Sequence, residues 1–227
     1  MNEEAEQQIR NLPAWARVAV IARCAERALP LVTLRENTST LATASIGAVR
    51  QAVESARQSA LTSQPSPAAR AEAAASVARQ AHPSAQRAES AAGNDNAAYA
   101  RAKHLFAGAY AASAAANAAR VASASGADLD ACDKVLSSTY DAVFYLSGGA
   151  ADFLGPAVLD DISWFQKQSS ARAVSQEFFN RPLWPLGEPS GWVEKIEKAG
   201  GSAKCGCSVV AQADVSEARK TWWQFWK

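Results

Sequence analysis

The sequence predicts an all-α protein, a multi-helix bundle with a long central alanine-rich helix and an aromatic-rich C-terminal helical cap. Alanine occupies 28 of the 60 positions from Ala68 to Ala127, and it is the best helix former because it loses no side-chain entropy. In the other segments apolar residues recur at three- and four-residue spacing, the period of a helix face packed on a core. Six of the seven tryptophans lie after residue 160, where they supply the bulk that alanine lacks.

Two helices are predicted before the alanine-rich stretch. The first begins at Pro13, because a proline fits the first helical turn, where its missing N–H needs no partner. It ends at Pro30, and the second helix runs from about Thr40 to Leu61. The inward stripes are Trp15, Val18, Ala22, Ala25 and Leu29 in the first helix, and Ala42, Ile46, Val49, Val53, Ala56 and Ala60 in the second.

The alanine-rich stretch begins with two short predicted helices. The first covers 68–81 and stops at His82-Pro83, because the residue before a proline is pushed out of the helical conformation. The second covers 84–92 and is closed by Gly93 in the position of a C-terminal cap.

The longest predicted helix follows, capped by Asn94 or Asp95 and ended by Gly126. We expect it at the centre of the bundle because it is apolar on most of its surface. The next helix begins at Asp128 or Asp130, where a carboxylate favours a helix start. The inward face of that helix is predicted to hold Val135, Leu136, Tyr140, Val143, Phe144 and Leu146.

The C-terminal third changes in composition. Pro156 opens a further helical region, a loop rich in proline and glycine follows, and short helices are predicted over 192–199 and 215–226. We therefore expect an alanine-rich helical bundle, 1–180. A Pro/Trp loop with a C-terminal aromatic helix, 181–227, is expected to pack on it as one structural unit.

Charge and composition disfavour several classes of protein. The formal net charge is +1, with 23 basic and 22 acidic residues spread along the chain, so no nucleic-acid partner is expected. No run of about 18 apolar residues occurs, so no membrane span is expected. The acidic N-terminus lacks the features of a secretory signal. Four cysteines without such a signal fit reduced thiols, and we expect a cytoplasmic protein.

No catalytic, metal or cofactor site is predicted from the polar residues. His82 and His104 have no second histidine at ligand spacing. Asp160 and Asp161 are adjacent in a predicted helix, so their side chains diverge around its surface. We expect these two carboxylates on a solvated face rather than in an acid–base pair.

The cysteines offer one motif, Cys205-Gly-Cys207. Two thiols one residue apart form a relaxed disulfide poorly, and no second pair completes a four-ligand zinc site. They are expected to be ordinary thiols, with a redox or metal-scavenging role as the alternative. Cys24 and Cys132 lie in apolar helical surroundings and are expected in the core.

The tryptophans near the C-terminus are the strongest surface candidates. Four aromatic residues within positions 222–226 cannot all share one helix face. Part of this area must therefore pack on the body, meet a protein partner or touch a lipid surface. Because tryptophan is enriched at protein interfaces, the candidate partner-binding residues are Trp184, Trp192, Trp222, Trp223 and Trp226.

Two local patterns resemble a known group of proteins. One runs from Leu12 to Leu31 and contains Leu-Pro-Ala-Trp-Ala-Arg and Ala-Arg-Cys-Ala-Glu-Arg-Ala-Leu-Pro-Leu; the other runs from Arg181 to Trp192. Both resemble alanine-rich helical proteins of bacteria, among them immunity proteins of polymorphic-toxin systems. The resemblance implies a helical, non-enzymatic protein of a bacterial conflict system, and it carries over no catalytic residues.

We therefore expect a non-enzymatic protein-binding protein, an immunity or accessory protein whose partner is a toxin or defence component. Its preformed helical surface would cover the partner's active or docking site. One alternative is a self-associating helical scaffold, because the apolar seam from Ile46 to Ala60 has the heptad-like spacing that also pairs helices between chains as a homo-oligomer. The other is a thiol-dependent sensor or enzyme that uses Cys205 and Cys207.

Overall fold

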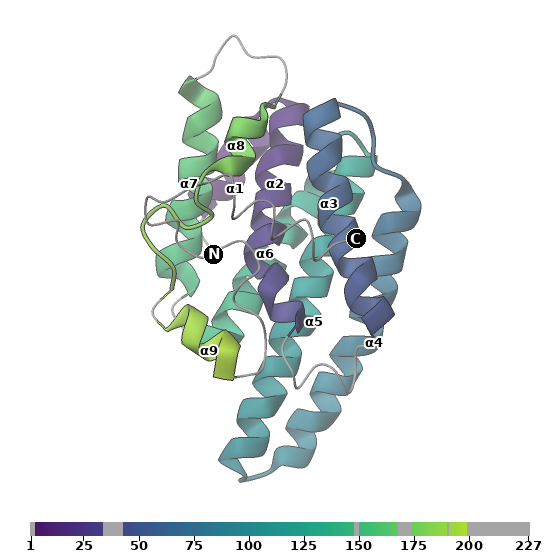
Figure 1. Ribbon diagram of the computed structural model, residues 1–227, viewed down its shortest axis with the longest axis vertical. Coiled ribbons are helices and arrows are strands. Elements are labelled where there is room, and N and C mark those ends of the chain that lie inside the picture. Colours follow the sequence, from purple (N-terminus) through teal and green to yellow (C-terminus); the bar gives the residue numbers. More distant parts are fainter. Residues whose placement is uncertain (1–2, 34–42, 148–149, 168–173, 190, 199–227) are drawn as a thin grey trace.

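The structure is a computed structural model, and it describes residues 3–33, 43–147, 150–167, 174–189 and 191–198 (Figure 1). Helices make up most of these residues, and no strand occurs among them. The predicted all-α bundle is confirmed. The elements are α1 (Glu3–Asn11), α2 (Ala14–Ala28), the 3-10 helix η1 (Leu29–Thr33), α3 (Thr43–Thr62), α4 (Ala68–Ala92), α5 (Asn96–Ser123), α6 (Leu129–Ser147), α7 (Ala150–Lys167), α8 (Gln176–Asn180) and α9 (Trp192–Lys198).

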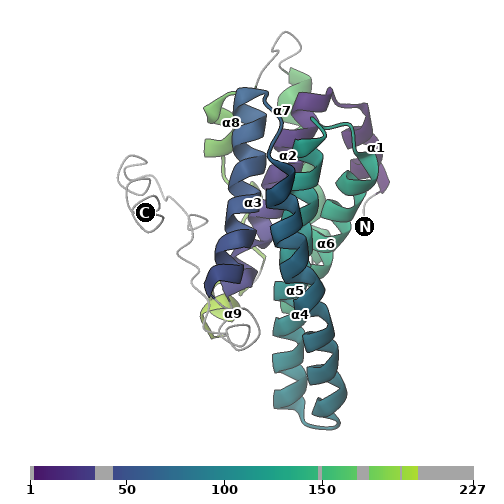
Figure 2. The same cartoon turned by 90° about the vertical axis from the view of Figure 1, so that its right-hand side faces the viewer.

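The long helix α5 lies at the centre of the bundle. It packs against α4, α6, α3 and α2, and alanines fill most of its buried positions. These small side chains let neighbouring helices approach closely, since the interaxial distance depends on the side chains at the contact. With α4 it forms a hairpin whose far half projects beyond the other helices (Figure 2). The predicted long central helix is thus present.

Local signals set both ends of α5. The Asp95 carboxylate accepts hydrogen bonds from the backbone N–H groups of Ala97 at 2.8 Å and Ala98 at 3.1 Å, the geometry of an N-terminal cap. At the other end Gly126 has φ +81°. A Cβ at this glycine would lie 2.2 Å from the carbonyl oxygen of Ala14. Glycine is therefore required where the chain leaving α5 crosses the start of α2.

The alanine-rich α4 is one helix with Pro83 inside it, so the predicted break at His82-Pro83 is wrong. A proline in a helix interior costs roughly 3 kcal/mol, because it removes a hydrogen bond and crowds the preceding turn. Packing offsets this cost. Ala81 and Ala85, on either side of the proline, are buried, and the His82 ring lies 3.1 Å from the Ser113 hydroxyl of α5.

Three further features differ from the sequence predictions. The first helix, α1, was not predicted, although Ala5, Ile9 and Leu12 are buried at helical spacing. Pro156 lies inside α7 rather than at its start, because the turns around it are held by packing. Phe144, predicted to face inward, is 46% exposed. Its position is apolar, but no other described helix covers that side of α6.

The last described segments belong to the same hydrophobic core as the rest. Trp184, Trp192 and Ile196 are buried in one cluster that also contains residues of α1 to α7. None of the described helices combines the length and the hydrophobicity that a membrane crossing requires.

Candidate functional site

The structure places Trp184 and Trp192 inside the protein, which corrects their prediction as surface anchors. They are 5% and 2% exposed, and their rings meet edge to face with centroids 5.7 Å apart. Two large apolar rings gain more from mutual burial than from exposure to water. The other three candidates, Trp222, Trp223 and Trp226, lie outside the described residues, as do Cys205 and Cys207.

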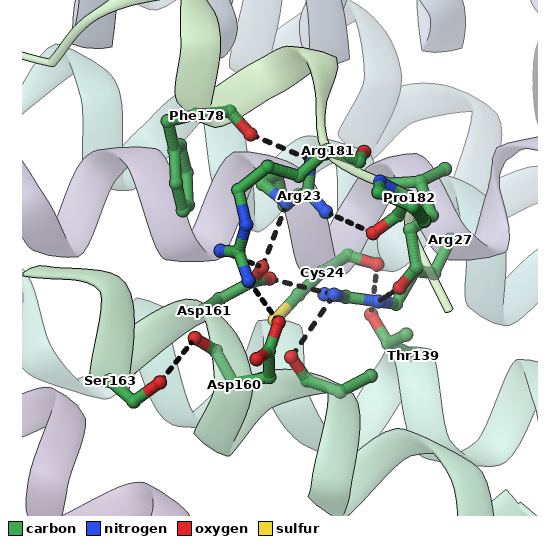
Figure 3. Close-up of polar contacts among 12 residues, drawn as sticks. Arg23, Cys24, Arg27, Thr139, Asp160, Asp161, Ser163, Phe178, Arg181 and Pro182 are labelled. Carbon is green, nitrogen blue, oxygen red and sulfur yellow. Dashed lines mark hydrogen bonds and ion pairs between the residues drawn. The ribbon is translucent and has the colours of Figure 1, made fainter. Parts of the chain in front are cut away.

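A buried charge cluster joins α2 to α7 (Figure 3). Arg23 and Arg27 lie one turn apart on α2, and both bind the carboxylate of Asp161. The Arg23 Nε–Oδ1 distance is 3.0 Å and the Arg27 Nη2–Oδ2 distance is 2.7 Å. All three side chains are buried, so the prediction that Asp161 faces solvent is wrong. The signal in the sequence is a pair of arginines four residues apart in α2, whose other charged residues are Arg17 and Glu26.

The two arginines also hold the chain between α8 and the following loop. Most of their remaining donors bind backbone carbonyls, whereas Arg27 Nη1 is buried with no hydrogen-bond partner. A planar guanidinium with five N–H donors suits this task. The accepting carbonyls are those of Phe178 (3.1 Å), Arg181 (3.2 Å) and Pro182 (2.7 Å) for Arg23, and those of Leu183 (2.8 Å) and Ala157 (3.2 Å) for Arg27.

Aromatic rings complete the cluster. The Arg23 guanidinium lies 5.1 Å from the ring centroid of Phe178, and that of Arg27 lies 5.8 Å from the ring of Trp184. Burial lowers the pKa of Arg23, against the attraction of Asp161. Burial also works to lower the pKa of Arg27, but Asp161, Cys24 and Glu26 together outweigh burial and the pKa is raised. Both stay charged, so they cannot act as acid or base. The cluster fastens α2, α7 and residues 178–183 together.

The described cysteines are not poised for chemistry. Burial raises the pKa of the Cys24 thiol to about 12 and that of Cys132 to about 11. A thiol reacts as its thiolate, so both are inert at neutral pH, as expected for core residues. Among the described residues no group of three or more His, Cys, Asp or Glu side chains is placed to hold a metal ion.

His82 of α4 and Ser113 of α5 meet on the hairpin in a way that suggests a nucleophile and its base. The Ser113 hydroxyl, however, donates to the carbonyl of Ala109 at 3.2 Å. The same hydroxyl lies 3.1 Å from the His82 Nε2, and the tautomer of the ring decides which of the two atoms donates. The contact is a structural link between α4 and α5 beside Pro83.

An aromatic surface runs along α5 and α6, and sequence reasoning missed it. Tyr145 stacks on Phe106 and on Tyr110, with ring centroids 5.1 and 5.6 Å away. Phe144 meets Tyr145 edge-on at 6.1 Å, and Tyr140 stacks on Phe144 at 6.1 Å. Together with Tyr99, two turns before Phe106 on α5, these rings form what we call the aromatic strip: Tyr99, Phe106, Tyr110, Tyr140, Phe144 and Tyr145.

The strip is partly open to solvent. Tyr99 is 42% and Phe144 46% exposed, and the Tyr110, Tyr140 and Tyr145 side chains are half-buried. Lys103 covers one face of Tyr99, with its ammonium 4.8 Å from the ring centroid. Exposed rings that are continuous with buried ones are typical of docking surfaces, because their geometry is fixed before a partner arrives.

Comparison with known proteins gives no family assignment: no protein-family model, curated protein or solved structure matches this chain. The resemblance to bacterial immunity proteins stays a prediction.

Proposed function

We propose that this chain is a non-enzymatic protein-binding protein that docks on its partner through the aromatic strip. The observation that carries the proposal is the pair of exposed rings, Tyr99 and Phe144, at the edge of stacked and partly buried ones. Aromatic residues are enriched at the centres of protein interfaces, where a few of them carry most of the binding energy.

The surroundings of the strip support the proposal. Its rings stand on α5 and α6, which pack against each other. Phe106 and Tyr110 are held against Tyr145, so few side-chain rotamers are lost on binding. A surface prepared in this way binds with a smaller entropic penalty. The mechanism would be occlusion, in which the rigid helical face covers the active or docking site of a toxin or defence component.

The scaffold alternative has less support from the seam that suggested it. In the seam from Ile46 to Ala60, the residues Val49, Val53, Ala56 and Ala60 are buried within the chain's own core. Their burial favours packing within one chain over pairing between chains. The thiol alternative depends on Cys205 and Cys207, which lie outside the described residues.

Affinity capture from cells that express the neighbouring genes tests the proposal. Phe144→Lys places a charge in the strip, while Leu186→Lys does the same at a residue that is 76% exposed and outside the strip. We expect the unaltered chain and Leu186→Lys each to capture a partner protein in stoichiometric amount. Phe144→Lys should bind that partner with an affinity at least about tenfold lower than the unaltered chain. Capture that is equal for both variants would exclude the strip, and no protein partner at all would exclude occlusion.

A further inference from the structure

We infer that residues 219–227 of the same chain occupy the aromatic strip when no partner is bound. This inference rests on the proposed function, because it assigns an internal competitor to the same surface. Three observations support it: the composition of the segment, the charges beside the strip, and the place where the described chain ends.

The composition of the segment fits an aromatic surface. Residues 219–227 read Arg-Lys-Thr-Trp-Trp-Gln-Phe-Trp-Lys, so four of nine side chains are aromatic. Leaving this much apolar area in water is unfavourable by roughly 25 cal/mol for each Å². Rings that meet edge to face or offset add about 0.5–1.5 kcal/mol for each pair beyond that. The strip offers such rings at Tyr99 and Phe144.

The charges are complementary. The segment carries three basic side chains and no acidic one. The strip has two carboxylates beside Tyr145, Asp141 on α6 and Glu89 on α4. Asp141 lies one turn before Tyr145 on the same face of α6, and burial together with the Glu89 and Asp141 charges raises the pKa of the Tyr145 hydroxyl. Lys103 occupies the far end at Tyr99, so the acidic half around Tyr145 is where Arg219, Lys220 or Lys227 would bind.

The end of the described chain lies close enough. Lys198 ends α9, and α9 packs against α6, which carries half of the strip. Twenty residues, 199–218, separate Lys198 from the segment. A chain of that length spans at most about 70 Å, whereas the 19 residues of α6 extend over about 28 Å. A tethered segment acts at an effective concentration of roughly a millimolar, so modest affinity suffices for occupancy.

Acrylamide quenching of tryptophan emission in the full chain tests this inference. Trp184 and Trp192 are buried, and Trp15 and Trp164 are half-buried. Trp222, Trp223 and Trp226 therefore determine the change when the segment leaves the strip. With Phe144→Lys and Tyr99→Lys combined, we expect the emission of these three of the seven tryptophans to become quenchable. The matched control Leu186→Lys should quench as the unaltered chain does.

Equal quenching in all three proteins would overturn the inference. Light scattering on the same samples shows whether the segment covers the strip of its own chain or that of a second copy. Tryptophans that are shielded in a monomer support the inference, and tryptophans that are shielded only in a dimer overturn it. Circular dichroism checks that the variants stay helical, which their exposed positions favour. The experiment contains no partner, so failure here leaves the capture experiment intact, and failure to capture a partner leaves the quenching result standing.

Discussion

The Arg23 Nε atom donates a hydrogen bond of 3.0 Å to the carboxylate of Asp161, although 138 residues separate the two in the chain. Arg27 binds the other carboxylate oxygen. Asp161→Asn would leave two buried guanidinium groups facing a neutral amide. Because removal of one partner strands a buried charge, we expect a loss of about 3–5 kcal/mol in the free energy of unfolding, measured by urea denaturation.

The neighbouring residue provides the control for this variant. Asp160 pairs with Arg181, and both side chains are partly exposed. A pair that solvent screens contributes about 1 kcal/mol or less, so Asp160→Asn should have a small effect. Similar losses in the free energy of unfolding for the two variants would show that burial does not determine how much the cluster contributes to stability.

Two glycines make a matched pair for testing the crossing of α2 and the end of α5. A Cβ at Gly126 would collide with the backbone of Ala14, and its φ of +81° adds strain; a Cβ at Gly47 of α3 meets nothing within 4 Å. We expect Gly126→Ala to lower the free energy of unfolding by about 2 kcal/mol or more. Gly47→Ala should raise it by about 0.5–1 kcal/mol. Thermal unfolding followed by circular dichroism shows whether each variant is more or less stable than the unaltered protein. A Gly126→Ala variant with unchanged stability would refute the close approach of Gly126 to Ala14.

Pro83 tests the continuity of α4. Alanine at this position restores a backbone N–H to the helix and removes the steric conflict, which favours the folded state. The loss of proline's rigidity in the unfolded chain offsets part of that gain. We expect Pro83→Ala to be more stable by about 1–2 kcal/mol in urea. A less stable variant would mean that the helix is interrupted at His82-Pro83 after all.

His82 predicts a pH dependence of stability. Burial lowers the pKa of His82 below its ordinary value of 6.5, with Asp141 opposing the shift. As pH falls below 6.5, the unfolded chain takes up this proton before the folded one, so stability is lost in that range and is complete above it. His82→Gln keeps a donor toward Ser113 without titrating. The difference in stability between the two proteins should therefore narrow as pH falls from 7 toward 5, and a constant difference would contradict the assignment.

Local signals made much of the fold predictable, and distant contacts made the rest unpredictable. Asp95 caps α5 and Gly93 follows α4 as predicted, because each acts on the residues next to it in the chain. The course of α4 through Pro83 depends on packing with α5, which the local sequence does not contain. The ion pair between Arg23 and Asp161 could not be predicted from the sequence either. Helical periodicity shows which face of a helix is apolar, but it does not show which charged residues meet on that face.

The candidate site shows the same division. Phe144 was predicted on an inward face because large apolar residues recur around it at helical spacing. Periodicity gives a direction on the helix, but it does not say whether another helix covers that direction. Trp184 and Trp192 were predicted to bind a partner because tryptophan is enriched at protein interfaces, but residue type alone does not distinguish an interface ring from a core ring, and the structure buries both in the core.

Site-specific photo-crosslinking tests the central claim, that the strip is a protein-docking surface, most directly. A benzophenone side chain replaces Phe144 in one chain and Leu186, the exposed residue outside the strip, in another, and both are irradiated in cells that express the neighbouring genes. The claim predicts a single crosslinked partner protein from position 144 and none from position 186. A partner crosslinked only from position 186, or no second protein crosslinked from position 144, would contradict it.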